Sequence, residues 1–284
     1  MGGLWRLRLP VATPAVRKLV QSVLDVVEAQ MSAWRPDSAL CRINASPVGA
    51  WVSVPAEALH VLQAGLDLMQ AAPGGFSILL GGVSAQGGFQ PGAPRAGCND
   101  AAMLEVSGGQ VRRMVDVTVD LNALAKGFAA DLVALALRKA GQSDFLIEFA
   151  GDIVAHGQRP DGLPWTVALE LPLANRIVPA RLIPVYNAGV ATSGGYRRHR
   201  GEASHLINPA TGQPLPVGGA SVAVVASTGI EADGWATVMS VLGPEAGLAL
   251  AEARGLAVSF IAATEGGFIE QGSSSMANWI SIAA

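Results

Sequence analysis

Apolar positions along the chain recur with two different periods, which predict both strands and helices. Near the N-terminus, Trp5, Leu7 and Leu9 alternate with arginines, so we expect a strand that ends at Pro10. Over residues 14–33 the apolar side chains recur at the spacing of an amphipathic helix. A second helix of this kind is predicted over residues 55–71.

The rest of the chain alternates between short apolar runs and further helical patterns. Helices are expected over residues 124–140, 229–241 and 245–254, the last two being separated by Gly243-Pro244. Strands are expected over residues 102–106, 110–118, 145–154, 165–171, 181–185, 190–191, 221–226 and 258–262. Residues 72–100 are rich in glycine and proline, and a stretch of this kind is either a surface loop or a functional one. The pattern predicts an α+β or α/β protein with a central sheet.

Composition removes several classes of function. Half of the 284 residues are hydrophobic, yet no run approaches the roughly 18 apolar residues that a membrane-spanning helix needs. The net charge of −3 gives no electrostatic reason to bind nucleic acid. Cys41 and Cys98 are too far apart for a CxxC pair, and we expect two reduced thiols. The N-terminal segment reads better as a strand than as a signal peptide, so a cytoplasmic location is expected.

A candidate metal site lies at the start of the helix after residue 226. Thr228 and Glu231 have the spacing of a capping box, which predicts that a helix begins there. Asp233 and Thr237 are then one turn apart on the same face and could offer two oxygens to Mg²⁺. The positive end of the helix dipole nearby would suit a phosphate. Spacing alone favours an aspartate that only complements the dipole, with Thr237 an ordinary helix residue.

Two other segments carry candidate chemistry. Lys126 follows a Val- and Thr-rich run at a turn into a helix, where its ammonium could reach a phosphate or simply face solvent. His205 precedes the turn signals Asn208-Pro209, and a histidine there could accept a proton from a hydroxyl group or be only structural. Walker, GxSxG and HExxH motifs are absent from the sequence, which removes the commonest nucleotide-binding, hydrolase and zinc patterns.

Taken in order, several segments resemble the ApbE family of flavin transferases, and the match runs almost from end to end. Ser32 to Asn44 is similar to the family's early pattern S-x-[FYW]-x-P-x-S-x-[LI]…N, and Phe76 with Gly81–Phe89 takes the place of its glycine-rich loop. Asp120 to Asp131 resembles DLGGIAKGYAVD. The remaining matches are Ala150-Gly151-Asp152, Thr192-Ser193-Gly194, Ser204-His205…Pro209…Thr211-Gly212 and Glu231-Ala232-Asp233…Thr237.

The resemblance implies a fold and a set of site residues. The fold would be a T-fold-like α+β architecture, a central mixed or antiparallel sheet with packed helices in a single domain over residues 1–284, with two subdomains about an FAD cleft as one possibility. Asp233, Thr237 and the carbonyl of Ala125 would bind Mg²⁺, and His205 and Asp233 would be catalytic. Contacts with FAD would come from Asn44, Phe76, Asp120, Lys126, Thr192, Ser193 and Gly194.

The implied activity is Mg²⁺-dependent transfer of FMN from FAD to a threonine hydroxyl of an acceptor flavoprotein, with release of AMP. The alternatives are a Mg²⁺-dependent FAD pyrophosphatase and a non-catalytic FAD-binding or assembly protein. The chain departs from the family pattern at several positions. Asn122, Ala123 and Ala150 replace glycines, Ser77 and Asn208 replace aspartates, Glu148 replaces an asparagine, and Ala85-Gln86-Gly87 stands where a tryptophan is usual.

Overall fold

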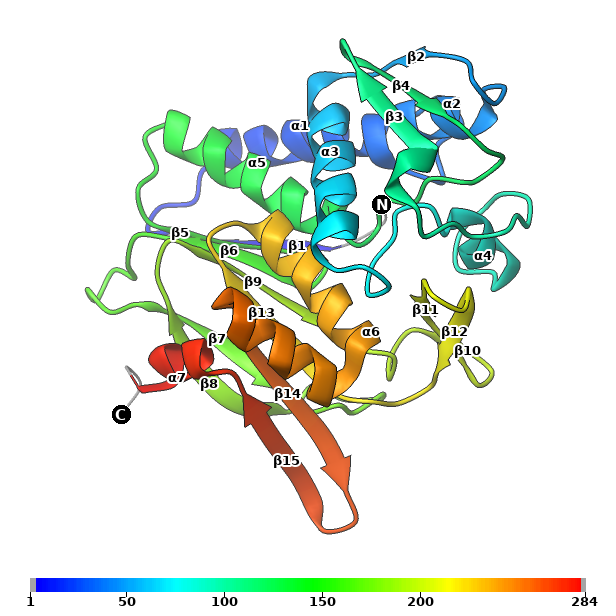
Figure 1. Ribbon diagram of the computed structural model, residues 1–284. Helices are drawn as coiled ribbons and strands as arrows, with labels where there is room; N and C mark the ends of the chain where they lie inside the picture. The colour runs from blue at the N-terminus through cyan, green and yellow to red at the C-terminus, as the bar shows by residue number, and fades with distance from the viewer. Residues whose placement is uncertain (1–3, 282–284) are drawn as a thin grey trace.

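A seven-stranded antiparallel sheet forms the centre of the protein in the computed structural model, which describes residues 4–281 (Figure 1). Its spatial order is β1-β5-β6-β9-β13-β14-β15, and each pair of neighbours is antiparallel. The strands are β1 (Trp5–Arg8), β5 (Phe145–Phe149), β6 (Asp152–His156), β9 (Ala188–Ser193), β13 (Ser221–Ala226), β14 (Ala257–Thr264) and β15 (Gly267–Gly272). The α+β class with a central antiparallel sheet is therefore confirmed.

Helices cover one face of this sheet, and a strand pair covers part of the other. The helices are α1 (Pro14–Met31), α2 (Ala39–Ala45), α3 (Ala56–Ala71), α5 (Ala125–Lys139) and α6 (Gly229–Arg254), and Figure 1 shows α5 and α6 lying along the sheet. The strand pair β7 (Trp165–Glu170) and β8 (Pro179–Val185) packs on the opposite face together with α7 (Ser274–Ser281). The sheet is consequently buried on both faces over its middle strands.

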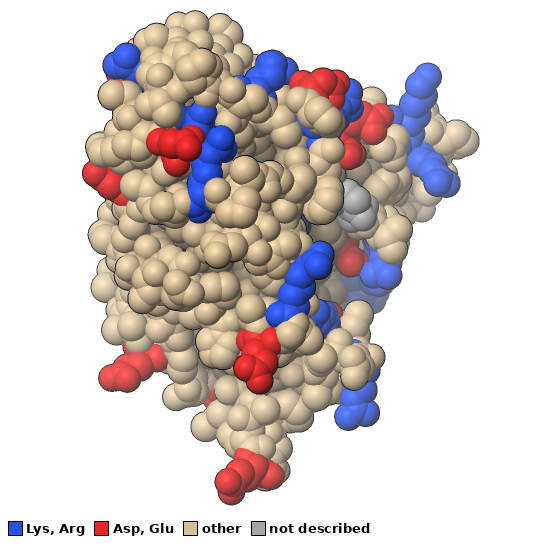
Figure 2. All heavy atoms as spheres, turned by 90° about the vertical axis from the view of Figure 1, so that its right-hand side faces the viewer, with Lys and Arg blue, Asp and Glu red and all other residues tan. Residues whose placement is uncertain are grey.

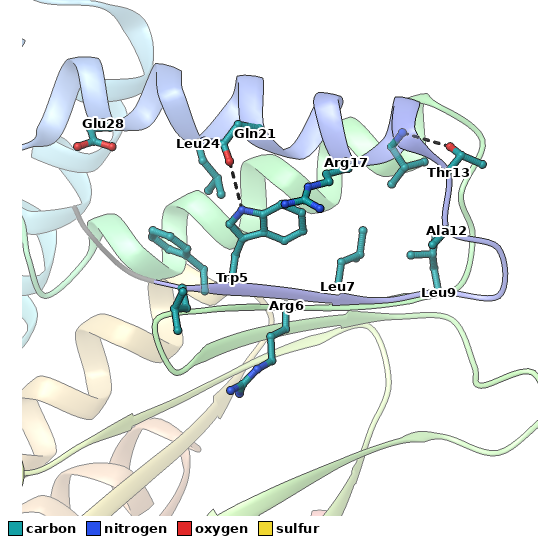
Figure 3. Close-up of a pocket in the computed structure, with 13 residues that line it drawn as sticks. Trp5, Arg6, Leu7, Leu9, Ala12, Thr13, Arg17, Gln21, Leu24 and Glu28 are labelled. Atoms are coloured by element: carbon teal, nitrogen blue, oxygen red, sulfur yellow. Dashed lines mark hydrogen bonds between the residues drawn. The ribbon is translucent and has the colours of Figure 1, made fainter.

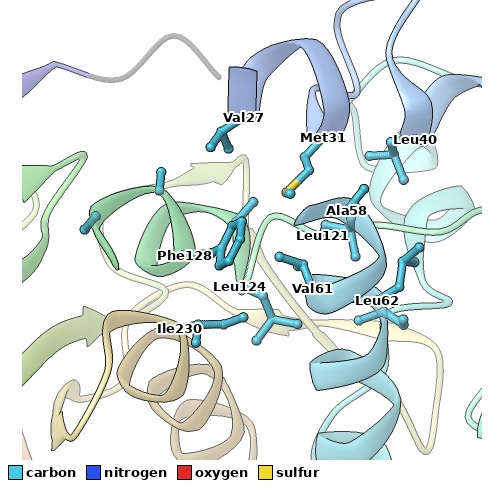
Figure 4. Packing of buried hydrophobic residues seen from close by; sticks show 14 of the residues in the cluster. Val27, Met31, Leu40, Ala58, Val61, Leu62, Leu121, Leu124, Phe128 and Ile230 are labelled. Atoms are coloured by element: carbon cyan, nitrogen blue, oxygen red, sulfur yellow. The ribbon is translucent and has the colours of Figure 1, made fainter. Parts of the chain in front are cut away.

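The largest hydrophobic core lies between the helices rather than within the sheet. Val27 and Met31 of α1 and Val61 and Leu62 of α3 meet Phe128 of α5 in this core (Figure 4). These positions follow the helical spacing seen in the sequence, and all five side chains are buried. Helix α1 begins where Thr13 accepts a hydrogen bond from the backbone N–H of Val16.

Two smaller sheets and a short helix complete the fold at one end of the main sheet. The strands are β2 (Val52–Ser53), β3 (Leu104–Ser107) and β4 (Gln110–Arg113) in one sheet, and β10 (His199–Arg200), β11 (Ala203–Asn208) and β12 (Gln213–Pro216) in the other. The glycine-rich stretch contains the short helix α4 (Gly81–Gln86), which Figure 1 shows beside β10–β12, and a 3-10 turn at Ala101–Met103 follows it.

Three predicted elements differ from the structure for local reasons. The expected strand 145–154 is two strands, because Ala150 and Gly151 both have positive φ angles, 53° and 99°, and form a two-residue hairpin turn of type I′. The expected strand 110–118 ends at Arg113, whose guanidinium turns inward to the carbonyls of Ile43, Ser46 and Val117. The two C-terminal helices form one run with a kink at Gly243.

The distribution of charge and the hydropathy of the helices can be described for the part of the chain that the structure covers. On the face in Figure 2, acidic and basic side chains are scattered with neutral areas between them, and no continuous basic area appears. Within residues 4–281 no helix is long and apolar enough to cross a membrane. The cytoplasmic location and the single domain over residues 1–284 stay predictions.

Candidate functional site

A cleft of about 800 Å³ lies where the helical layer, the β7–β8 pair and the β10–β12 sheet meet. It brings together residues that are as much as 235 positions apart, from Arg6 to Val241. Nine residues singled out from the sequence line it: Phe76, Asp120, Lys126, Thr192, Ser193, Gly194, His205, Asp233 and Thr237. A cleft of this size is within the range of small-molecule and cofactor sites.

Two carboxylates share one ammonium group at the bottom of the cleft. Lys126 Nζ lies 2.7 Å from Asp152 Oδ2 and 2.6 Å from Asp233 Oδ1. Asp152 and Asp233 are only 2% and 4% exposed, so both negative charges are withdrawn from water. The three side chains carry a net charge of −1 when all are ionised, and a site of this kind favours a further cation.

The pKa values of the pair reflect this crowding. Burial, followed by the neighbouring Asp233 carboxylate, raises the pKa of Asp152 above its usual range although Lys126 opposes the shift. For Lys126, burial works against the charged form, but the two carboxylates outweigh it and raise the pKa of the ammonium. Lys126 therefore remains charged at neutral pH.

A close crossing of α5 and α6 sets the position of Asp233. The N–H of Gly127 donates to Asp233 Oδ2 at 3.1 Å, and a Cβ atom at residue 127 would overlap the backbone of Gly229. The glycine after Lys126 is thus required by the close approach of two backbones. As a result, the first turn of α5 carries Lys126 directly to the aspartate of α6.

The first backbone N–H groups of α6 donate to acceptors within the protein and not to the cleft. Asp131 of α5 accepts hydrogen bonds from the N–H groups of Gly229 and Ile230, at 2.7 and 2.9 Å. Thr228 caps the N–H of Glu231, so the predicted capping position is confirmed. These internal acceptors occupy the positive end of the helix, and the expectation that it binds a phosphate is wrong.

The donor set around Asp233 fits a hard divalent cation. Asp233 and Thr237 both line the cleft, and the Thr237 hydroxyl donates to the Asp233 carbonyl one turn away, at 3.3 Å. Ala125 is the first residue of α5 and does not line the cleft. Carboxylate, hydroxyl and carbonyl oxygens are the ligands that Mg²⁺ prefers. Within residues 4–281 no three His, Cys, Asp or Glu side chains form a metal cluster, so other ligands would come from substrate and water.

His205 faces the same cleft from β11. Its Nδ1 lies 3.0 Å from the carbonyl of Arg198, which can only accept, so Nδ1 carries the proton and Nε2 keeps a free lone pair. Burial lowers the pKa of His205 to about 4, and the charges of Arg198 and Lys126 act in the same direction. The ring is therefore neutral at physiological pH and is able to accept a proton.

The other predicted contacts occupy the floor and the walls of the cleft. Phe76 is 3% exposed and belongs to the floor, while Thr192 and Ser193 end strand β9 at the wall. Gly194 follows them where a side chain would overlap the ring of Tyr196. Burial raises the pKa of Asp120, whose Oδ1 accepts from the N–H of Asn122.

Asn44 lies outside the lining of the cleft. Its side-chain amide donates to the carbonyl of Val119 at 2.9 Å and accepts from the N–H of the same residue at 2.8 Å. This pairing fixes the chain immediately before Asp120. The geometry thus makes Asn44 a residue that positions the wall of the cleft.

Sequence reasoning missed several residues that line or complete the site. Asp152 was noted only as part of a motif, and its burial against Lys126 could not be read from that motif. Arg6 and Arg8 line the cleft from β1, opposite to the face that Trp5 and Leu7 present to α1. The alternation of arginines with apolar residues in this strand was the available signal. Arg197 and Arg198 also line it, and Arg197 pairs with Glu170.

Comparisons with known proteins show the family to which the sequence is similar. A model of the ApbE family matches residues 1–260. A protein of Klebsiella pneumoniae named FAD:protein FMN transferase is 31% identical over 94% of this chain and 84% of its own length, and one of Haemophilus influenzae with the same name is 32% identical over 90% and 80%.

Solved structures give the same result. The flavin transferase ApbE of Vibrio cholerae superposes with a TM-score of 0.87 at 30% identity, over 98% of this chain and 96% of that one. An apo flavinyl transferase ApbE of Pseudomonas stutzeri gives 0.83 at 27% identity, over 98% and 96%.

Proposed function

Because the chain belongs to the ApbE family, we propose that it is an FAD:protein FMN transferase that uses Mg²⁺ to move FMN from FAD to a threonine hydroxyl of an acceptor flavoprotein, with release of AMP. The observation that carries the proposal is the cleft lined by Lys126, Asp233 and the neutral His205, with Asp152 buried against Lys126. Such a cluster offers both cation-binding oxygens and a positive charge to one diphosphate.

In this proposal the residues of α5 and α6 hold the reacting diphosphate. Asp233 and Thr237, with the carbonyl of Ala125, would hold Mg²⁺, which when bound neutralises charge on phosphate oxygens and favours in-line displacement. The N–H of Gly127 and the ammonium of Lys126 fix the Asp233 carboxylate in one orientation. Lys126 then stands beside the substrate as a second positive charge.

His205 would serve as the proton acceptor. The acceptor's hydroxyl oxygen forms a bond to the phosphorus on the FMN side, while the bond from that phosphorus to the bridging oxygen breaks and AMP leaves with this oxygen. The hydroxyl proton passes to Nε2 of His205, because Nδ1–H is held by the Arg198 carbonyl. Removing a general base of this kind typically costs a factor of 10² to 10⁴ in rate.

The test is an incubation of the protein with FAD, Mg²⁺ and a candidate flavoprotein, followed by intact-mass measurement of the acceptor. We expect the acceptor to gain the mass of FMN as AMP appears. The Asp233→Asn variant should lose this activity by 10²-fold or more, because the metal-binding charge is removed. Glu231→Gln, a carboxylate lost two residues earlier on the same helix but outside the cleft, is the matched control. Free FMN and AMP without a labelled acceptor would instead indicate a pyrophosphatase.

A further inference from the structure

Strand β1 lies at the edge of the main sheet, and a groove of about 600 Å³ runs between it and α1. Trp5 and Leu7 point from β1 toward the helix, while Arg6 points away from it (Figure 3). Val16 and Arg17 belong to the helix side of the groove. We call this space the β1–α1 groove. Apolar side chains beside a free strand edge form a surface suited to an added strand.

Some backbone N–H and C=O groups of β1 point away from β5, and no described strand pairs with them. The N–H of Ala150 donates to the carbonyl of Leu4 at 3.0 Å, so Leu4 and Ala150 form a hydrogen-bonded pair of the antiparallel ladder. In an antiparallel ladder every second residue forms a hydrogen-bonded pair, so the backbone N–H and C=O groups of Arg6 and Arg8 also point toward β5. The N–H and C=O groups of Trp5 and Leu7 consequently point outward, where no described strand pairs with β1.

Charge defines the kind of segment that this edge would accept. Arg6 and Arg8 project on the cleft side of β1, and Arg17 lies in the groove on α1. Arg6 pairs with Glu148 at 3.2 Å, whereas Arg8 and Arg17 form no ion pair within residues 4–281. An added strand would therefore favour acidic side chains toward the cleft and apolar ones toward the groove. A second copy of this chain fits poorly, because its own Arg6 and Arg8 would approach these arginines.

The edge is also continuous with the candidate active site. Arg6 lines both the groove and the cleft. The Leu4 end of β1 bonds to the Ala150–Gly151 turn, and the next residue along the chain, Asp152, binds Lys126. A segment paired with β1 would thus lead toward the Asp152–Lys126–Asp233 cluster.

We propose that the acceptor protein docks by adding an extended acidic–apolar segment to the free edge of β1. Apolar side chains of this segment would fill the β1–α1 groove, and acidic ones would lie beside Arg6 and Arg8. The inference rests on the proposed function, which requires a protein substrate. It adds to that function the surface on which the protein substrate docks, the free edge of β1, and the acidic–apolar pattern that this surface recognises.

The test uses a fluorescent peptide of about ten residues with alternating valine and aspartate, long enough to span the strand. Fluorescence anisotropy gives its affinity, and NMR amide exchange reports on each residue of β1. On saturation we expect the Trp5 and Leu7 amides to exchange at least tenfold more slowly, while those of Arg6 and Arg8, already paired with β5, change little. A peptide of alternating valine and lysine should not bind.

Charge variants on α1 supply the control. Arg17→Glu should weaken peptide binding about tenfold, whereas Lys18→Glu, the same charge change on an exposed neighbour outside the groove, should alter it less than twofold. The proposal is overturned if the Trp5 and Leu7 amides stay unprotected, if both variants behave alike, or if sedimentation shows that a second copy already covers this edge. No FAD is needed, so a failed FMN transfer with intact peptide binding would count against the proposed function alone.

Discussion

At the scale of single residues, the environment of the cleft changes the protonation of ordinary side chains. Lys126 would be an exposed helix lysine by its sequence context, yet two buried carboxylates make it the centre of the cleft. His205 differs from a typical histidine because its Nδ1–H donates to a backbone carbonyl and its ring is half-buried beside Arg198 and Lys126. Both effects fix a protonation state at neutral pH, Lys126 charged and His205 neutral.

The lowered pKa of His205 gives a prediction about stability and pH. Its pKa is about 4 in the folded protein against 6.5 in a model peptide, so between these values the unfolded chain binds the proton and the folded one does not. Stability from His205 is therefore complete above pH 6.5 and is lost as the pH falls toward 4. Urea unfolding of the wild type should show this loss. In His205→Gln the free energy of unfolding should depend less steeply on pH between 4 and 6.5.

Transfer kinetics test the same residue independently. His205→Gln should lower the transfer rate by about 10²-fold at neutral pH with FAD affinity retained. His199→Gln removes an exposed histidine that does not line the cleft, and we expect wild-type rates from it. An unchanged rate in His205→Gln at all pH values would remove His205 from the mechanism.

At the scale of elements, the crossing of α5 and α6 determines the geometry of the site. Gly127 and Gly229 let the two backbones touch, and Asp131 joins the helices through the N-terminus of α6. The same contact puts Asp233 within reach of both Lys126 and the Gly127 amide. A change at this crossing should therefore affect both stability and the site.

We expect Gly127→Ala to destabilise the fold by about 2 kcal/mol or more. Alanine gains about 1 kcal/mol in helix propensity, but its Cβ overlaps the Gly229 backbone, and overpacking of this kind typically costs 1–3 kcal/mol or more when backbones must separate. Urea denaturation measures the difference. Lys139→Ala, at an exposed position of the same helix, should stay within about 0.5 kcal/mol of the wild type. A Gly127→Ala protein as stable as that control would show that the helices can separate freely.

At the scale of the whole molecule, the cleft forms only where three layers meet. Its walls come from the helical layer, the main sheet and the small β10–β12 sheet. Arg198 links two of these parts through a 2.8 Å hydrogen bond to the carbonyl of Phe89, and the rings of Phe89 and His205 meet edge to face. A ligand that fills this space stabilises the assembled molecule rather than one element.

Substrate and metal together should therefore raise the melting temperature. At a hundredfold excess over Kd, binding adds about 2.7 kcal/mol, which corresponds to roughly 5 °C or more for a protein of this size. We expect EDTA to remove most of the shift caused by FAD with Mg²⁺, and Asp233→Asn to abolish the Mg²⁺-dependent part. Differential scanning fluorimetry measures the shift in melting temperature. An equal shift in Asp233→Asn would place the metal elsewhere.

Sequence patterns predict the long helices, most of the strands and the kind of chemistry, but not the short helices α2, α4 and α7. Local periodicity fixes these features, so α1, α3 and α5 were found close to their observed bounds. The motif segments indicated Lys126, His205, Asp233 and Thr237, which all line one cleft. The sequence predicts one continuous strand over residues 145–154, which the structure divides into β5 and β6. Alanine rarely adopts the positive φ angle that Ala150 has, so the turn at this residue was not predicted.

The way in which these elements act together depends on tertiary contacts. The strand order, the partner of the α6 N-terminus and the burial of Asp152 all depend on contacts between residues far apart in the chain. The place of Asn44 beneath Val119 and the free edge of β1 were equally invisible in the sequence. Periodicity reports which face of an element is apolar, but it does not report which element covers that face.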